Sequence, residues 1–154
     1  MSSELFMRRA LELAAQAAAE GDVPVGAVVV HEGQIVGEGR NTRERDNDPT
    51  GHAEVVAWRA AASALGRWRL DDCALFVTLE PCTMCVGALV HARVRRVVFA
   101  ASEPKAGALK SARALMDAEQ SGYFNHRFEW QGGVLEGEAS EMLSGFFKQR
   151  RMKL

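Results

Sequence analysis

Two short segments of the chain contain residue types that could bind a metal ion. The sequence HAE begins at His52, and the sequence PCTMC begins at Pro81 and contains Cys82 and Cys85. Two cysteines three residues apart at a helix start have the usual spacing for thiolate ligands of one Zn²⁺. His52 can supply a third ligand. Three protein ligands leave one tetrahedral position open, which is typical of a catalytic zinc whose bound water has a pKa of about 7.

A carboxylate follows the histidine at the spacing that proton transfer would need. Glu54 lies two residues beyond His52. As a general base it could take a proton from a metal-bound water, and as the resulting acid it could protonate a ring nitrogen and a leaving amine. This combination suits the hydrolytic deamination of an amidine-like ring.

A lone pair of cysteines also occurs in redox dithiols and in structural zinc sites. The residues before Cys82 are LEP and lack the WCGPC pattern of thioredoxins. A structural zinc needs a fourth ligand, for which Cys73 or His91 could be proposed. Cys73 is more simply a small core residue at a strand start, and His91 a cation that offsets a helix dipole. The joint spacing of the two segments favours a catalytic site, with a structural zinc or redox module as an alternative.

Both segments are expected to begin a helix that follows a loop. Apolar periodicity and turn residues predict helices over residues 3–20, 52–65, 82–92 and 137–151, and strands over 25–30, 34–39, 74–79, 94–100 and 128–130. Residues 41–50 are expected to form a polar loop, and residues 101–125 a loop with a helix-like patch near 111–120. Helices that alternate with apolar strands predict an α/β fold, a three-layer α/β/α sandwich on one mixed five-stranded sheet.

Composition limits the organisation and the compartment of the protein. A length of 154 residues with 47% hydrophobic residues fits a single domain over residues 1–154. The 19 basic and 20 acidic residues give a net charge of −1, so contact with a nucleic acid would require a local basic patch. Three cysteines, no signal-peptide pattern and no apolar stretch of about 20 residues predict a cytoplasmic protein that does not enter a membrane.

The pattern H-x-E followed by P-C-x-x-C resembles the signature of the zinc-dependent cytidine and nucleobase deaminase superfamily. The likeness continues in DVPVGA from Asp22, GRN ending at Asn41, DPTGHAE from Asp48, VTLEPCTMC from Val77, NHR from Asn125 and FFKQRR from Phe146. These segments resemble the bacterial tRNA-specific adenosine deaminases, and they span nearly the whole chain. The sequence HAE together with PCxMC favours this branch over the cytidine deaminases of free nucleosides.

The resemblance implies a cytidine deaminase-like fold and a specific reaction. Relatives convert the wobble adenosine of a tRNA anticodon to inosine, with the base flipped into a pocket. By resemblance, His52, Cys82 and Cys85 hold one Zn²⁺ per subunit, and Glu54 moves protons. The implied partners are the tRNA anticodon loop and a second copy of the chain in a homodimer.

The resemblance also implies substrate contacts. Val23 would line the base pocket, Asn41 would hold the nucleoside, and the backbone of Ala53 would touch the base. Phe147 and Arg150 would contact neighbouring nucleotides by stacking and charge. Phe146 and Phe147 are adjacent and cannot share one helix face, so one is expected in the core, and the other either in the core or as a platform for RNA.

Two features depart from the family pattern. Lys110 stands where the family tends to have glycine, and the stretch from residue 111 to 125 is longer than usual. This loop shapes the RNA-facing side in relatives. A deaminase of free guanine, cytosine or adenosine on the same fold therefore remains an alternative.

Overall fold

The computed structural model describes residues 3–117, 122 and 124–152, and within them one mixed sheet carries the fold. Its strands are β1 (Gly26–His31), β2 (Gln34–Arg40), β3 (Cys73–Leu79), β4 (Arg96–Ala101) and β5 (Glu129–Gln131), in the order β2-β1-β3-β4-β5. Strand β1 is antiparallel to both of its neighbours, whereas β3, β4 and β5 run parallel to one another. The predicted mixed five-stranded sheet is confirmed.

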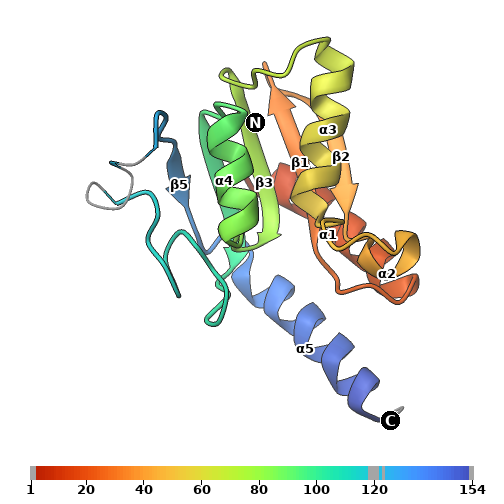
Figure 1. Ribbon diagram of the computed structural model, residues 1–154. Helices are drawn as coiled ribbons and strands as arrows, with labels where there is room; N and C mark the ends of the chain where they lie inside the picture. The colour runs from red at the N-terminus through yellow and green to blue at the C-terminus, as the bar shows by residue number, and fades with distance from the viewer. Residues whose placement is uncertain (1–2, 118–121, 123, 153–154) are drawn as a thin grey trace.

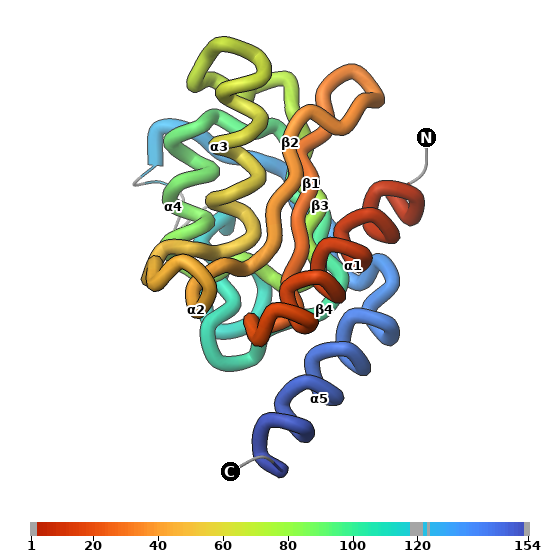
Figure 2. Tube along the Cα trace, turned by 90° about the vertical axis from the view of Figure 1, so that its right-hand side faces the viewer, coloured from red at the N-terminus to blue at the C-terminus, as the bar shows by residue number. Residues whose placement is uncertain are grey.

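Helices cover both faces of this sheet. They are α1 (Ser3–Ala19), α2 (Arg43–Asp46), α3 (Ala53–Leu65), α4 (Thr83–His91) and α5 (Glu136–Met152). Figure 1 shows α3 and α4 side by side on one face, and Figure 2 shows α1 and α5 on the other. Alternate residues of the strands enter two separate clusters, because successive side chains of a strand point to opposite faces. The three-layer α/β/α sandwich is confirmed.

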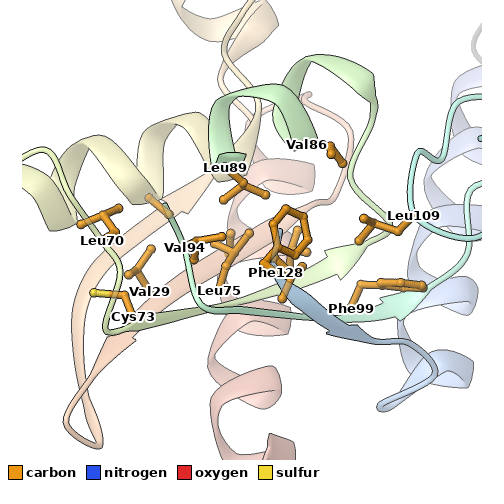
Figure 3. Close-up of a cluster of buried hydrophobic side chains, with 14 of the residues drawn as sticks. Val29, Leu70, Cys73, Leu75, Val86, Leu89, Val94, Phe99, Leu109 and Phe128 are labelled. Carbon is orange, nitrogen blue, oxygen red and sulfur yellow. The ribbon is translucent and has the colours of Figure 1, made fainter. Parts of the chain in front are cut away.

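The cluster beneath α3 and α4 packs against the inner faces of both helices. Figure 3 shows Val86 and Leu89 of α4 above Leu75 and Phe99 of the sheet. Cys73 lies in the same cluster and is fully buried, as its interpretation as a core residue predicts.

Helix α3 lies unusually close to β2. A Cβ atom at Gly39 would stand 2.3 Å from the carbonyl oxygen of Ala53, and one at Gly37 would stand 2.3 Å from that of Ala57. Real Cβ atoms do not approach backbone this closely, so only glycine permits the contact. The two glycines thereby bring the start of α3, where the HAE segment lies, down against the sheet edge.

Two expectations for the loops differ from the structure. The polar loop at 41–50 contains the short helix α2, and residues 111–117 form turns where part of a helix-like patch was expected. Residues 118–120 of that patch lie outside the described residues. The backbone N–H groups of Glu44 and Arg45 in α2 donate to the carboxylate of Asp22, at 2.8 and 3.2 Å. This cap comes from a distant part of the chain, so local sequence could not indicate it.

No helix in the described ranges is both long enough and apolar enough to cross a bilayer.

Candidate active site

The site forms where the N-termini of two helices meet at one edge of the sheet. Strands β2 and β3 both run antiparallel to β1, so they run in the same direction and end at the same edge. Helix α3 follows β2 and helix α4 follows β3 along the chain. His52 is the N-cap residue of α3, and Cys82 is the N-cap residue of α4. The topology therefore brings the two predicted segments together.

Neither N-cap side chain performs the usual work of a cap. N-cap positions favour Ser, Thr, Asp and Asn, whose side-chain oxygen accepts a hydrogen bond from the first turn. His52 and Cys82 make no such capping bond. Both side chains turn toward each other instead, so local helix stability is given up for the arrangement of the site.

Three potential ligand atoms converge at this point. The Nδ1 atom of His52 lies 3.7 Å from Sγ of Cys82 and 3.5 Å from Sγ of Cys85. All three atoms lie within 4.8 Å of one another. A tetrahedral zinc with ordinary Zn–S and Zn–N bonds requires sulfur–nitrogen distances of roughly 3.5 Å. The three side chains therefore fit one tetrahedral metal ion.

Hydrogen bonds among these side chains shift the pKa values of the two thiols in opposite directions. The pKa of the Cys82 thiol falls to about 4, chiefly because it accepts a hydrogen bond from Cys85 and also one from His52. The pKa of the Cys85 thiol is raised, because it donates to Cys82 and is buried. Cys82 is thus the readier thiolate, at a helix N-terminus where the macrodipole favours negative charge.

Glu54 lies in the first turn of α3 beside the ligand group. Its side chain is only 4% exposed and lines the same cavity as His52 and Cys82. Burial raises the pKa of the Glu54 carboxyl above its ordinary value. A carboxyl group whose pKa is raised holds its proton more readily and is suited to pass protons in both directions.

A cavity of about 250 Å³ opens beside these groups. It brings together most of the residues singled out in the sequence, namely Val23, Asn41, His52, Glu54, Cys82 and Phe147. Ala53, Cys85 and Arg150 are not among its lining residues. The cavity is also lined by Val25, Arg43, Leu79, Glu80, Glu103 and Ala106, which sequence reasoning did not select.

Asn41 connects the end of β2 to the start of α3. Its side-chain oxygen Oδ1 accepts a hydrogen bond from the backbone N–H of Ala53 at 2.9 Å, and both residues are buried. Asn41 thus serves the helix start that the His52 side chain leaves uncapped. Since the N–H of Ala53 is bonded to Asn41, contact between the Ala53 backbone and a base stays a prediction.

The two adjacent phenylalanines of α5 have different environments. Phe146 is half-buried, whereas Phe147 is 42% exposed and forms part of the cavity wall. Arg150 lies on the surface, where it pairs with Glu44 of α2 at 3.3 Å and stands over the Phe146 ring. The C-terminal half of α5 projects past the sheet (Figure 2), and Phe147 on this half lines the cavity.

Two buried acids, one beside the cavity and one in its wall, could not be identified from the sequence. Asp22 caps α2, and Glu80 is bonded to the loop that carries Glu103. The sequence signal at Glu80-Pro81 indicates only the end of a strand. Their partners lie more than 20 residues away, so no local pattern could have identified them.

Comparisons with known proteins agree with this geometry. A family model described as MafB19-like deaminase matches residues 1–151. A tRNA-specific adenosine deaminase of Bacillus subtilis is 45% identical over 150 residues. The match covers 97% of this chain and 91% of the length of that relative.

Solved structures are similar as well. One structure comes from a study of A-to-I editing by tRNA:A34 deaminases at the wobble position of transfer RNA. It superposes with a TM-score of 0.83 at 40% sequence identity, and the match covers 90% of this chain and 98% of the chain in that structure. A guanine deaminase from Bacillus subtilis superposes with a TM-score of 0.63 at 46% identity, over 66% of each chain. Similarity over nearly the full length, together with three converging groups that could hold a metal ion beside a buried carboxylate, leads to one conclusion: the chain belongs to the family of the tRNA-specific adenosine deaminases.

Proposed function

We propose that the protein catalyses the zinc-dependent hydrolytic deamination of adenosine to inosine at the wobble position of a tRNA anticodon. The observation that carries the proposal is the convergence of His52, Cys82 and Cys85 beside buried Glu54 in one cavity. The similar proteins named for tRNA-specific adenosine deamination support the substrate.

Each of these side chains has a role in the reaction. His52, Cys82 and Cys85 would hold one Zn²⁺, which supplies an activated water when it is bound. Glu54 would take one proton from the water that attacks C6 and deliver it to ring nitrogen N1. It would then take the remaining proton from the oxygen now bonded to C6 and deliver it to the amine, which departs as ammonia. Adenosine and water thereby become inosine and ammonia.

The remaining cavity residues are suited to receive a flipped nucleoside. Val23 and Leu79 supply apolar surface for a base, and Asn41 supplies a polar group. Because Oδ1 of Asn41 is bonded to Ala53, its amide nitrogen is the group left to contact the nucleoside. Partly exposed Phe147 offers a ring on which a neighbouring base can stack, and Arg150 lies one helical turn away on the same helix.

The similarity to a guanine deaminase keeps a free base as the second candidate substrate. The two candidates differ in what they require outside the cavity. An RNA substrate needs contacts for neighbouring nucleotides, which Phe147 and Arg150 can provide, whereas a free base needs only the cavity itself. The exposed part of the Phe147 ring, with Arg150 outside the cavity on the same helix, therefore favours RNA.

A direct assay separates these candidates. The zinc-loaded protein is incubated with an anticodon stem-loop that contains a wobble adenosine, and in parallel with free adenosine, guanine, cytosine and cytidine. We expect inosine in the RNA and no turnover of the free compounds. Turnover of a free compound with no inosine in the RNA would overturn the assignment to tRNA.

We propose a homodimer for the assembly and the cytoplasm as its location. The outer face of α3 and α4 carries an apolar groove lined in part by Trp58, Trp68 and Leu70, and Trp68 is 62% exposed. A second copy would bury this surface, and three free cysteines suit a reducing compartment. Sedimentation velocity tests the assembly: wild type should be dimeric and Trp68→Glu monomeric, while a monomeric wild type would refute the dimer.

A further inference from the structure

Glu80 is a buried carboxylate that the proposed reaction does not use. It directly follows β3, is 2% exposed, and forms no ion pair with a Lys or Arg among the described residues. Five hydrogen bonds converge on it instead. The donors are the backbone N–H groups of Glu103 (3.0 Å), Leu109 (3.1 Å), Lys110 (2.8 Å) and Ser111 (2.9 Å), and the Ser111 hydroxyl (2.5 Å).

All five donors belong to one segment, the 103–111 loop, which folds around the carboxylate. Gly107 packs directly against it: a Cβ atom there would lie 2.3 Å from the Glu80 side-chain carbon Cδ. The loop also pairs with the residues that follow Glu80. The N–H of Ala108 donates to the carbonyl of Pro81 at 2.8 Å, and Gly107 forms a backbone bridge with Cys82.

This loop is one wall of the active-site cavity. Glu103 and Ala106 line the cavity together with Glu54 and Cys82. Glu80, which holds this wall, therefore lies only two residues before Cys82, a proposed metal ligand. From this arrangement we propose that Glu80 is a positioning residue, which sets the 103–111 loop at the distance from the metal ligands that a flipped nucleoside requires.

The physical basis is the cost of gathering N–H groups of like polarity around one point. Without an anion at their centre, four backbone N–H dipoles repel one another and would be left unpaired where one is buried and three are partly buried. The carboxylate supplies negative charge and two acceptor atoms, and hydrogen bonds to a charged acceptor are the stronger kind. The loop is otherwise attached by its pairing with Pro81 and Cys82 and by Ala108 and Leu109, which are buried in the core cluster; among its described hydrogen bonds to other segments, those to Glu80 are the ones to a charged acceptor.

The inference rests on the proposed function, and Glu80→Gln tests it. Glutamine keeps the size of the side chain but replaces one oxygen by an NH₂ group, which faces N–H donors and cannot accept from them. We expect Glu80→Gln to bind one zinc per chain, as wild type does. Its KM for the RNA should rise about tenfold or more, whereas kcat should fall less than threefold. The reason is that a displaced cavity wall weakens substrate binding more than it slows proton transfer.

A second variant perturbs the contact from the loop side. Gly107→Ala inserts a methyl group against the carboxylate while Glu80 stays intact, so it should raise KM in the same way. Val98→Ala is the control, because Val98 is buried in the cluster on the opposite face of the sheet. It should lower stability without changing KM.

Hydrogen exchange gives a readout that does not depend on turnover. In Glu80→Gln the amides of residues 103 and 109–111 should exchange at least tenfold faster, while the amides of α3 and α4 stay unchanged. Unchanged KM and exchange would overturn the inference, as would loss of zinc or a uniform rise in exchange, since both indicate a merely structural role. A wild type inactive on RNA would refute the proposed function, and the exchange pattern would still decide the role of Glu80.

Discussion

Asn41 has a structural role and a proposed substrate role that substitution can separate. Its Oδ1 atom is the acceptor for the buried N–H of Ala53, at 2.9 Å. In Asn41→Ala this N–H loses its partner at the first residue of α3, which costs about 1–3 kcal/mol. The loss of a helix cap costs a similar amount, about 0.5–2 kcal/mol. A chain of this length loses about 2–4 °C in Tm per kcal/mol, so we expect Asn41→Ala to unfold roughly 2–12 °C below wild type.

Asn41→Asp should behave differently. Aspartate keeps an oxygen at the same place, and its negative charge is favoured at the N-terminus of α3. Its stability should therefore stay close to that of wild type. Aspartate lacks the amide nitrogen that is left to contact the nucleoside, so its KM for the RNA should rise even though the protein is fully folded.

The assay is thermal unfolding followed by circular dichroism, at one fixed zinc concentration because a bound metal shifts Tm by mass action. Kinetics on the anticodon stem-loop are measured for the same samples. An Asn41→Ala protein as stable as wild type would refute the contribution of this hydrogen bond. An Asn41→Asp protein as unstable as Asn41→Ala would show that the acceptor oxygen is not the reason.

Three further outcomes are expected. Glu54→Ala should retain zinc, measured by elemental analysis, and lose inosine formation by at least about 10²-fold, because only proton transfer is removed; loss of zinc would place Glu54 among the ligands. Cys73→Ala should keep one zinc per chain whereas Cys82→Ala should lose it, and zinc loss in Cys73→Ala would contradict the three-ligand set. If Arg150 and Lys110 contact phosphates, each change to alanine should weaken RNA binding and reduce the slope of log K against log salt concentration by about one. An unchanged slope would exclude that residue from contact with phosphates.

Much of the fold follows from local patterns in the sequence. The apolar run VGAVVV is buried on both faces in β1, as a continuous β-branched stretch predicts. Helix α3 ends before Gly66, which adopts the left-handed conformation that commonly terminates helices. The order and type of the main elements could be predicted because periodicity and stop signals are contained within each segment.

The loops were harder to predict, for a physical reason. The expected helix-like patch near 111–120 is absent from residues 111–117. The N–H groups of residues 109–111 donate to Glu80, and those of Ala112 and Arg113 both donate to the carbonyl of Gly107 instead of to the carbonyl four residues before. Helix α2 is likewise capped by Asp22. In both cases a buried carboxylate from a distant segment decides the backbone, and local propensity does not include such a contact.

The sequence by itself determined the chemical identity of the site: a histidine and a carboxylate two residues apart, two cysteines three residues apart, and a helix expected after each pair. Only the tertiary structure decided that these groups meet. Strands β2 and β3 flank β1 and run in the same direction, so the helices that follow them begin at one edge of the sheet. Close packing at Gly37 and Gly39, and the loop held by Glu80, then set the cavity around them, because such distances depend on packing between segments far apart in the chain.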